Sequence, residues 1–118
     1  MVDRYIYHIC RSEEWEKALQ SGYYNGSSQD LDDGFIHFST GGQLRESAAK
    51  HRSGQDGLVV LTVDIKRLGK ALKWEPSRAG KLFPHLYGRI SIEDVHKVSP
   101  LPLGTDGKHV FSIAFQEQ

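Results

Sequence analysis

The sequence has little cysteine and no long hydrophobic run, and each of these features excludes a class of protein. Its single cysteine, Cys10, excludes an internal disulfide framework and any zinc or iron–sulfur site built from several cysteines. The longest aliphatic run, Leu58–Leu61, is far shorter than the roughly 20 residues that cross a bilayer. The first residues, Met1–Arg4, include no apolar signal-peptide segment. We therefore expect a cytoplasmic protein without a membrane partner.

The chain also has no net charge, because 15 basic side chains balance 15 acidic ones. Residues 66–89 are nevertheless rich in Lys and Arg, and Glu75 is their only acid. This segment could hold a phosphate-bearing ligand, since Lys and Arg supply charge and hydrogen-bond donors. The alternative is an exposed loop whose lysines point into water. Because the chain as a whole is neutral, we expect no binding to long nucleic acid.

The 118 residues and 13.3 kDa correspond to a single domain spanning residues 1–118. Helices are expected from Ser12 to Gly22 and from Thr40 to about Arg52, and Tyr23–Asp33 should form an exposed loop. Strands are expected at Arg4–Cys10, Gly34–Ser39, Leu58–Ile65, Val95–Leu103 and His109–Phe115. The third of these strands is apolar on both faces, so it should be central in its sheet. The fold class is therefore α+β, with two early helices and about five to seven short strands in a mixed or largely antiparallel sheet.

None of the common nucleotide-binding or catalytic patterns is present, neither GxGxxG, a P-loop, GxSxG nor HExxH. The remaining candidates for chemistry are histidines, of which the sequence has six. His8 and His37 lie in expected strands, and His85 lies in the segment Phe83–Gly88. These three define the candidate site.

His37 is placed where a strand leads into a helix. Alternation puts Ile36 and Phe38 on one face of the strand and His37 and Ser39 on the other. The segment Thr40–Gln43 has the spacing of a capping box, and the free N–H groups of the helix that follows could accept an anion. We therefore predict a ligand-binding wall here. The alternative is a histidine whose ring is satisfied by a backbone carbonyl at a sheet edge.

His8, His85 and Tyr87 each have a structural alternative. His8 could bind a ligand or be packed and hydrogen-bonded inside the protein. In Phe83–Gly88, Pro84 fixes the backbone and could hold His85 and Tyr87 rigidly; alternatively, the aromatic residues of this segment cover the core.

Glu75, Cys10 and a metal site are weaker candidates for chemistry. Glu75 could pair with a neighbouring lysine or act as a polar ligand group. Cys10 has no basic partner in sequence, so we expect a buried, inert thiol. His37, His85 and Glu75 could in principle bind a metal, but no pair of them has the i, i+2 or i, i+4 spacing that builds such sites, and we expect no metal.

Three segments together are similar to a bacterial family catalogued as domain of unknown function 952. They are Tyr5–His8, Asp33–Thr40 and Phe83–Gly88, in that order, with Trp74–Glu75 between the last two. The resemblance covers roughly residues 4–103, and its GFIHFST and FPHLYG segments are fairly specific.

A more distant resemblance connects the chain to the ADP-ribosyltransferases. His8 matches the histidine of their first-strand Tyr-His-Gly-Thr segment, although Ile9 and Cys10 stand in place of the glycine and threonine. Residues 36–39 look like the His-Val-His-Leu-Ser strand of the RNA 2′-phosphotransferases, in which a histidine binds the cofactor; His37 matches that histidine. No residue is placed at the late-strand position that usually carries a glutamate, glutamine or arginine.

This second resemblance implies a split sheet with a cleft, and NAD as cofactor. His8 would hold a ribose hydroxyl or the nicotinamide amide, and the opposite wall would be His37, Ser39, Thr40 and Gln43. His37, His85 and Tyr87 would be catalytic, the last two by orienting the acceptor or stacking on a ring. Lys81 and Arg89 would supply charge for phosphates, with Lys73 and Arg78 as alternatives. The partner would then be a nucleotide-like small molecule, and the second hypothesis is a non-catalytic nucleotide-binding or interaction module.

Overall fold

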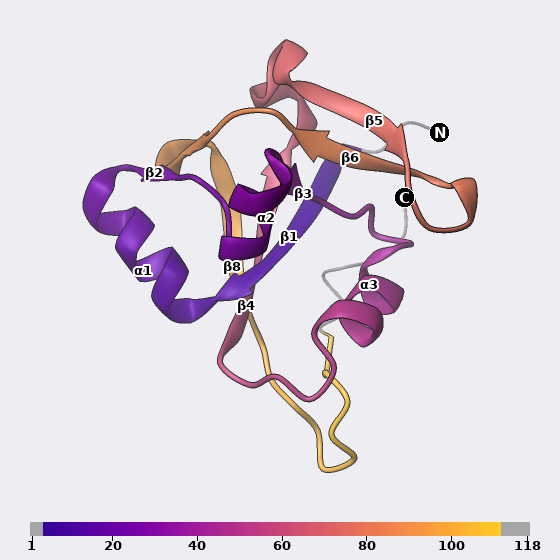
Figure 1. The fold of residues 1–118 in the computed structure, drawn as a ribbon. Helices are drawn as coiled ribbons and strands as arrows, with labels where there is room; N and C mark the ends of the chain where they lie inside the picture. Colours follow the sequence, from indigo (N-terminus) through magenta and orange to yellow (C-terminus); the bar gives the residue numbers. More distant parts are fainter. Residues whose placement is uncertain (1–3, 112–118) are drawn as a thin grey trace.

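The computed structural model describes residues 4–111, without the side chain of Arg78. Three α-helices and eight β-strands occur in this part of the chain (Figure 1). The helices are α1 (Ser12–Ser21), α2 (Ser28–Asp33) and α3 (Leu44–His51). The strands are β1 (Tyr5–Arg11), β2 (Tyr23–Tyr24), β3 (Ile36–His37), β4 (Leu58–Asp64), β5 (Leu72–Pro76), β6 (Leu82–Leu86), β7 (Ile90–Ser91) and β8 (Val95–Leu101). Every strand pair is antiparallel, and the α+β prediction is confirmed.

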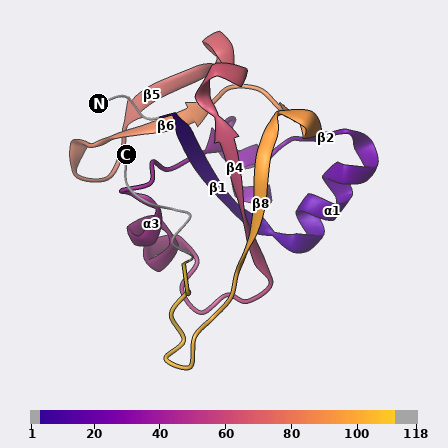
Figure 2. The ribbon, with the colours of Figure 1, turned by 180° about the vertical axis from the view of Figure 1, so that it is seen from behind.

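The strands form two three-stranded sheets and one short pair. The first sheet has the order β1–β4–β8, whose strands lie side by side in Figure 2, and the second has the order β3–β6–β5. β2 pairs with β7. The two larger sheets meet where Tyr7 and Ser39 exchange a pair of backbone hydrogen bonds of 2.8 Å. As predicted, β4 is the central strand of its sheet.

β1 is buried on both faces because α1 and α3 lie on opposite sides of it (Figure 1). Ile6 and Cys10 face one apolar cluster, which also contains Ile36 and Phe38. The alternate residues of β1 face a second cluster, built with Leu44 and Ala48 of α3. His8 shares the face of Ile6 and Cys10 by strand alternation, so its ring enters the interior.

The prediction of an exposed loop at Tyr23–Asp33 was wrong. The segment contains β2 and α2, and Tyr24 and Asp30 are only 2% and 3% exposed. A capping box starts α2: Asp30 N–H donates to Ser27 Oγ at 3.3 Å, and Ser27 N–H donates to Asp30 Oδ2 at 2.7 Å. Gly26 precedes it at φ +104°, and a Cβ there would lie 2.8 Å from the Asp30 Cβ, so only glycine fits.

The start of α3 also differs from the prediction. The helix begins at Leu44, because Thr40–Gln43 forms a separate turn closed by a 3.1 Å bond from Gln43 N–H to Thr40 O. One half of the expected capping box is present, since Thr40 N–H donates to Gln43 Oε1 at 3.1 Å. The N–H groups that were expected to receive an anion directly after Thr40 therefore belong to a turn and not to the helix end.

At the other end of the chain, β8 ends at Leu101, two residues before the predicted limit. Of the predicted last strand, His109 forms one isolated bridge with Leu103, and residues 112–115 lie outside the described part. Among residues 4–111, no helix is both long enough and apolar enough to pass through a membrane.

Candidate functional site

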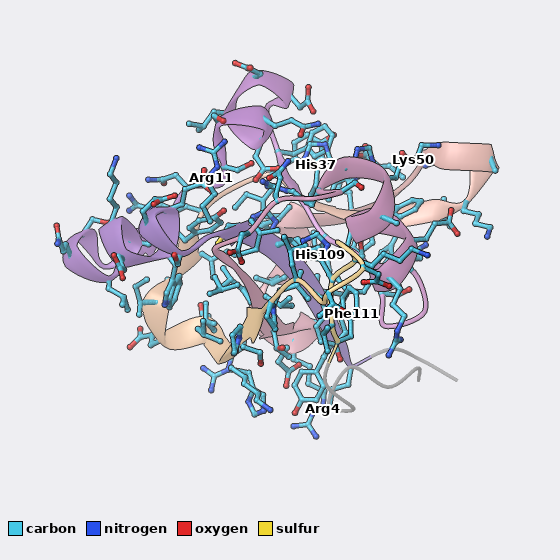
Figure 3. All side chains as sticks on the ribbon, turned by 90° about the horizontal axis from the view of Figure 1, so that it is seen from below. Arg4, Arg11, His37, Lys50, His109 and Phe111 are labelled. Atoms are coloured by element: carbon cyan, nitrogen blue, oxygen red, sulfur yellow. The ribbon has the colours of Figure 1, made fainter. Side chains whose placement is uncertain are left out.

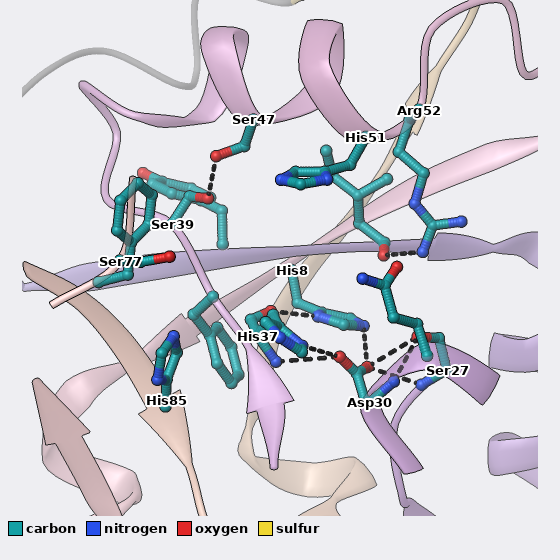
Figure 4. A pocket seen from close by; sticks show the side chains of 15 residues that line it. His8, Ser27, Asp30, His37, Ser39, Ser47, His51, Arg52, Ser77 and His85 are labelled. Atoms are coloured by element: carbon teal, nitrogen blue, oxygen red, sulfur yellow. Dashed lines mark hydrogen bonds and ion pairs between the residues drawn. The ribbon is translucent and has the colours of Figure 1, made fainter. Parts of the chain in front are cut away.

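A cleft of about 190 Å³ lies between β1, α2, α3 and the β3–β6–β5 sheet (Figure 4). Its lining includes four of the six histidines and four serines, namely His8, His37, His51, His85, Ser27, Ser39, Ser47 and Ser77. Asp30 and Arg52 add one carboxylate and one guanidinium. The cleft is therefore polar and rich in groups that both donate and accept hydrogen bonds.

Four of the predicted site residues meet in this cleft. They are His8, His37, Ser39 and His85, which come from β1, from β3 and the residues after it, and from β6. His37 and His85 are direct register partners in the β3–β6 pair, so their side chains share one face of the sheet. Their ring centroids are 5.5 Å apart.

The other predicted residues do not line the cleft: Thr40, Gln43, Lys81, Arg89 and Tyr87. Gln43 links the turn before α3 to β6, because its Nε2 donates to Leu82 O at 2.9 Å. The Arg89 guanidinium lies 3.7 Å above the centre of the Tyr23 ring. Lys81 is exposed in the β5–β6 hairpin. The assignments of Thr40, Gln43, Lys81 and Arg89 as cofactor-binding residues, and of Tyr87 as a catalytic residue, stay predictions.

His8 forms one wall of the cleft, and both of its ring nitrogens are engaged inside the protein. Nδ1 donates to His37 O at 2.6 Å, and Nε2 accepts from the Tyr24 hydroxyl at 2.6 Å. Burial lowers the pKa of His8, although the nearby Asp30 carboxylate opposes this. The ring is therefore neutral, and it would meet a ligand through its carbon edge.

We expect acid to destabilise the protein through His8. Its folded-state pKa lies below the 6.5 of the unfolded chain, so below pH 6.5 the unfolded state binds more protons. This contribution to stability is present above pH 6.5 and is lost as the pH falls, with a slope of at most about 1.4 kcal/mol per pH unit. Urea unfolding at several pH values between 5 and 8 should show a shallower slope in His8→Gln than in the unsubstituted protein. Identical slopes would contradict this origin.

Asp30 is a buried carboxylate with all of its hydrogen bonds inside the protein. Oδ1 accepts from His37 Nδ1 at 2.5 Å and from His37 N–H at 3.1 Å, and Oδ2 accepts from Ser27 N–H and Oγ at 2.7 and 2.9 Å. Burial alone would raise the pKa of Asp30, but the hydrogen bonds from His37 and Ser27 and the proximity of His8 outweigh it and lower that pKa to about 2. Asp30 thus stays ionised and fixes the His37 ring.

His37 lies between two carboxylates. Besides Asp30 at Nδ1, it contacts Asp33 through Nε2 at 3.1 Å. An ionised carboxylate only accepts hydrogen bonds, so Nδ1 of His37 donates to Asp30. The Asp33 contact is open to solvent, because the two side chains are 37% and 43% exposed.

The β5–β6 pair brings Glu75 beside His85. Glu75 Oε1 accepts from His85 Nδ1 at 2.8 Å and from the Tyr87 hydroxyl at 2.7 Å. Both hydrogen bonds lower the pKa of Glu75, and the bond from Tyr87 has the larger effect. Phe35 stacks on the His85 ring at 4.2 Å between centroids. Within residues 4–111, no protein group is hydrogen-bonded to Nε2 of His85, which distinguishes this ring from His8 and His37.

Sequence reasoning missed several cleft residues. Asp30 could have been found from its spacing to Ser27, the [ST]-x-x-[DE] pattern of a capping box. His51 and Arg52 carried no signal, since only the packing of α3 turns them toward the cleft. Glu75 pairs with a histidine and a tyrosine, not with the neighbouring lysine that was considered.

Cys10 is fully buried, as expected, and burial raises its pKa to about 12, so it stays a thiol. No group of three possible metal ligands occurs among residues 4–111. A second hollow, of about 390 Å³, lies beside α3 at His109 and Phe111, which are well separated from His37 in Figure 3. None of the predicted site residues lines it.

The sequence model of a family described as "Protein of unknown function (DUF952)" matches residues 9–98. The chain is similar to a crystal structure of protein CC0527 from Caulobacter crescentus, with 43% identity, a TM-score of 0.89, and coverage of 94% of this chain and 97% of that one. A solution NMR structure of CC0527 shares 46% identity at a TM-score of 0.79, over 88% of this chain and 90% of that one. No curated protein matches the chain.

Proposed function

The chain belongs to the DUF952 family of proteins of unknown function, and we propose from the chemistry of its cleft that it binds the nicotinamide–ribose part of NAD and transfers an ADP-ribosyl or related group. The observation that carries this proposal is the convergence of His37, Ser39 and His85 in one cleft. They reach it from two segments, β3 with the residues after it and β6, at the edge where two sheets meet. A cytoplasmic location, where NAD is available, is part of the proposal.

The size of the cleft supports a part of a dinucleotide as ligand. Its volume of about 190 Å³ is below the roughly 300–1,000 Å³ of sites that enclose drug-sized molecules. One ring with its ribose fits such a space, and the rest of NAD would lie outside it. We assign the pyrophosphate to Arg52 at one end of the cleft, whose Nη2 also donates to Ile9 O at 3.2 Å.

Ser39 supports recognition of a ribose. Its hydroxyl donates to Ser47 Oγ at 2.8 Å, so the Ser39 oxygen can accept a hydrogen bond from a ligand hydroxyl. His8 closes the wall behind it as a neutral ring. Held in this way, the ribose would be positioned for loss of nicotinamide through a cation-like transition state.

Ser39→Ala should weaken NAD binding by about three- to tenfold, the value of one hydrogen bond. The matched control is Ser53→Ala, an exposed serine just after α3 that does not line the cleft. Calorimetric titration with NAD measures both affinities. Equal affinities of the two variants for NAD would mean that Ser39 does not contact the ligand.

The second candidate is a non-catalytic nucleotide-binding module. It is favoured by the fact that His8 and His37 engage all four of their ring nitrogens in contacts within the protein. The release of free nicotinamide from NAD separates the two candidates. Release supports the transferase, binding without release supports the module, and no binding at millimolar NAD contradicts both.

A further inference from the structure

We infer that Glu75 and His85 form a proton-accepting pair, and that the acceptor in the proposed transfer is a hydroxyl group, which loses its proton as it attacks. The inference rests on the proposed function and adds to it the chemical class of the second substrate. It also gives Glu75 the role of a positioning residue for His85.

The position of the hydrogen on His85 follows from its partner. Glu75 Oε1 lies 2.8 Å from Nδ1, and a carboxylate can only accept, so the hydrogen of the neutral ring is on Nδ1. The lone pair is then on Nε2. His85 is one of the residues that line the cleft (Figure 4), and no group within residues 4–111 is hydrogen-bonded to its Nε2, so we assign this lone pair to a bound molecule.

The ring is also held in place. Phe35 stacks on it at 4.2 Å with an interplanar angle of 27°, and the His37 ring meets it edge-on at 5.5 Å. His85 is only 7% exposed, so water has little access to it. A base on a fixed ring loses little conformational freedom when the substrate binds.

Tyr87 fixes the carboxylate in turn. Its hydroxyl donates at 2.7 Å to the same Oε1 that accepts from His85. The two hydrogen bonds stabilise the charged carboxylate, which lowers the pKa of Glu75 and keeps it an acceptor at neutral pH. Tyr87, predicted to be catalytic, therefore acts through Glu75 and not by contact with the substrate.

The other two predicted histidines cannot take this role as they stand. His8 Nε2 accepts from Tyr24 at 2.6 Å, and both nitrogens of His37 face carboxylates. His85 is thus the predicted site histidine with a free lone pair in the cleft.

A general base is needed only for an acceptor that carries a proton, so its presence indicates the chemical class of the acceptor. A carboxylate acceptor is already deprotonated at neutral pH, whereas water or an alcohol must lose a proton as it attacks. In the proposed step, the acceptor oxygen forms a bond to C1′ of the ribose as the C1′–N bond to nicotinamide breaks. That bonding pair leaves with the nicotinamide ring nitrogen, and the acceptor proton moves to Nε2 of His85.

The test uses Glu75→Gln in the full chain, with Glu16→Gln as the matched control, since Glu16 is exposed on α1 outside the cleft. A glutamine can donate to Nδ1 as well as accept from it, so it no longer specifies the tautomer. We expect kcat for nicotinamide release to fall about 10- to 100-fold in Glu75→Gln, with KM for NAD nearly unchanged. Added methanol should compete with water and yield the methyl glycoside of ADP-ribose.

A ¹⁵N spectrum of the imidazole nitrogens provides a readout that does not depend on turnover. The neutral His85 ring should carry its hydrogen on Nδ1 in the unsubstituted protein and in Glu16→Gln, and the Nε2–H form should appear in Glu75→Gln. A hydrogen on Nε2 of His85 in the unsubstituted protein would contradict the proton-accepting pair. Release of nicotinamide by Glu75→Gln at the rate of the unsubstituted protein would also contradict the pair. A product without incorporated methanol would contradict the assignment of a hydroxyl acceptor. Absence of nicotinamide release from the unsubstituted protein would refute the proposed function itself, and with it the assignment of an acceptor.

Discussion

Replacement of His85 by glutamine is expected to slow nicotinamide release from NAD by about 10²–10⁴-fold, the usual contribution of a positioned general base. Glutamine is uncharged at every pH and cannot take up the acceptor proton. Its side chain still reaches the polar groups around Glu75, so NAD binding should change much less than the rate. Release is followed by chromatography of free nicotinamide under saturating NAD.

The matched control is His96→Gln. His96 is exposed on β8 and stacks on Tyr5 at 4.9 Å between ring centroids, away from the cleft. It should keep the unsubstituted rate. An amide correlation spectrum verifies that both variants are folded. If His85→Gln released nicotinamide as fast as His96→Gln did, His85 would have no part in the chemistry.

Asp30→Ala is expected to lower the free energy of unfolding by about 3–5 kcal/mol, because each buried donor that loses its acceptor costs about 1–3 kcal/mol. The substitution removes the acceptor of Ser27 N–H, of His37 N–H and of His37 Nδ1. The effect should shrink in acid. The pKa of Asp30 is lowered from 3.8 to about 2, so its contribution is present above pH 3.8 and is lost as the pH falls through about 2.

Asp33→Ala is the matched control, because Asp33 contacts the same imidazole from the solvent side, where its side chain is 43% exposed. An exposed ion pair contributes about 0–1 kcal/mol. Urea unfolding at neutral pH gives both values. Equal losses for the two variants would mean that the buried carboxylate does not stabilise this part of the fold.

The sequence patterns that predicted structure well were those set by apolar residues. Alternation placed Ile36 and Phe38 in the core, where they are 1% and 2% exposed, and the apolar run of β4 indicated a central strand. Such patterns are local and require only the period of the strand. The two resemblances selected His8, His37 and His85, and these three histidines do meet in one cleft.

What could not be predicted depends on contacts between distant residues. Tyr23–Asp33 is polar, and Tyr24 and Asp30 in it are buried because Asp30 accepts hydrogen bonds from Ser27 and His37 and because Tyr24 donates one to His8. The Glu75–His85 contact needs the register of the β5–β6 hairpin, which neither segment determines alone. Lys81 is a candidate only because of its charge, and it lies outside the cleft. The charge of a side chain does not determine where that side chain lies in the fold.

The proposed function requires that NAD binds in the cleft between the two sheets. Titration of ¹⁵N-labelled protein with NAD, followed by amide correlation spectra, tests it most directly. We expect the largest shift changes at residues 39, 47, 51 and 85, which surround the cleft from the segment after β3, from α3 and from β6. Changes confined to other surfaces, or none at millimolar NAD, would contradict the claim.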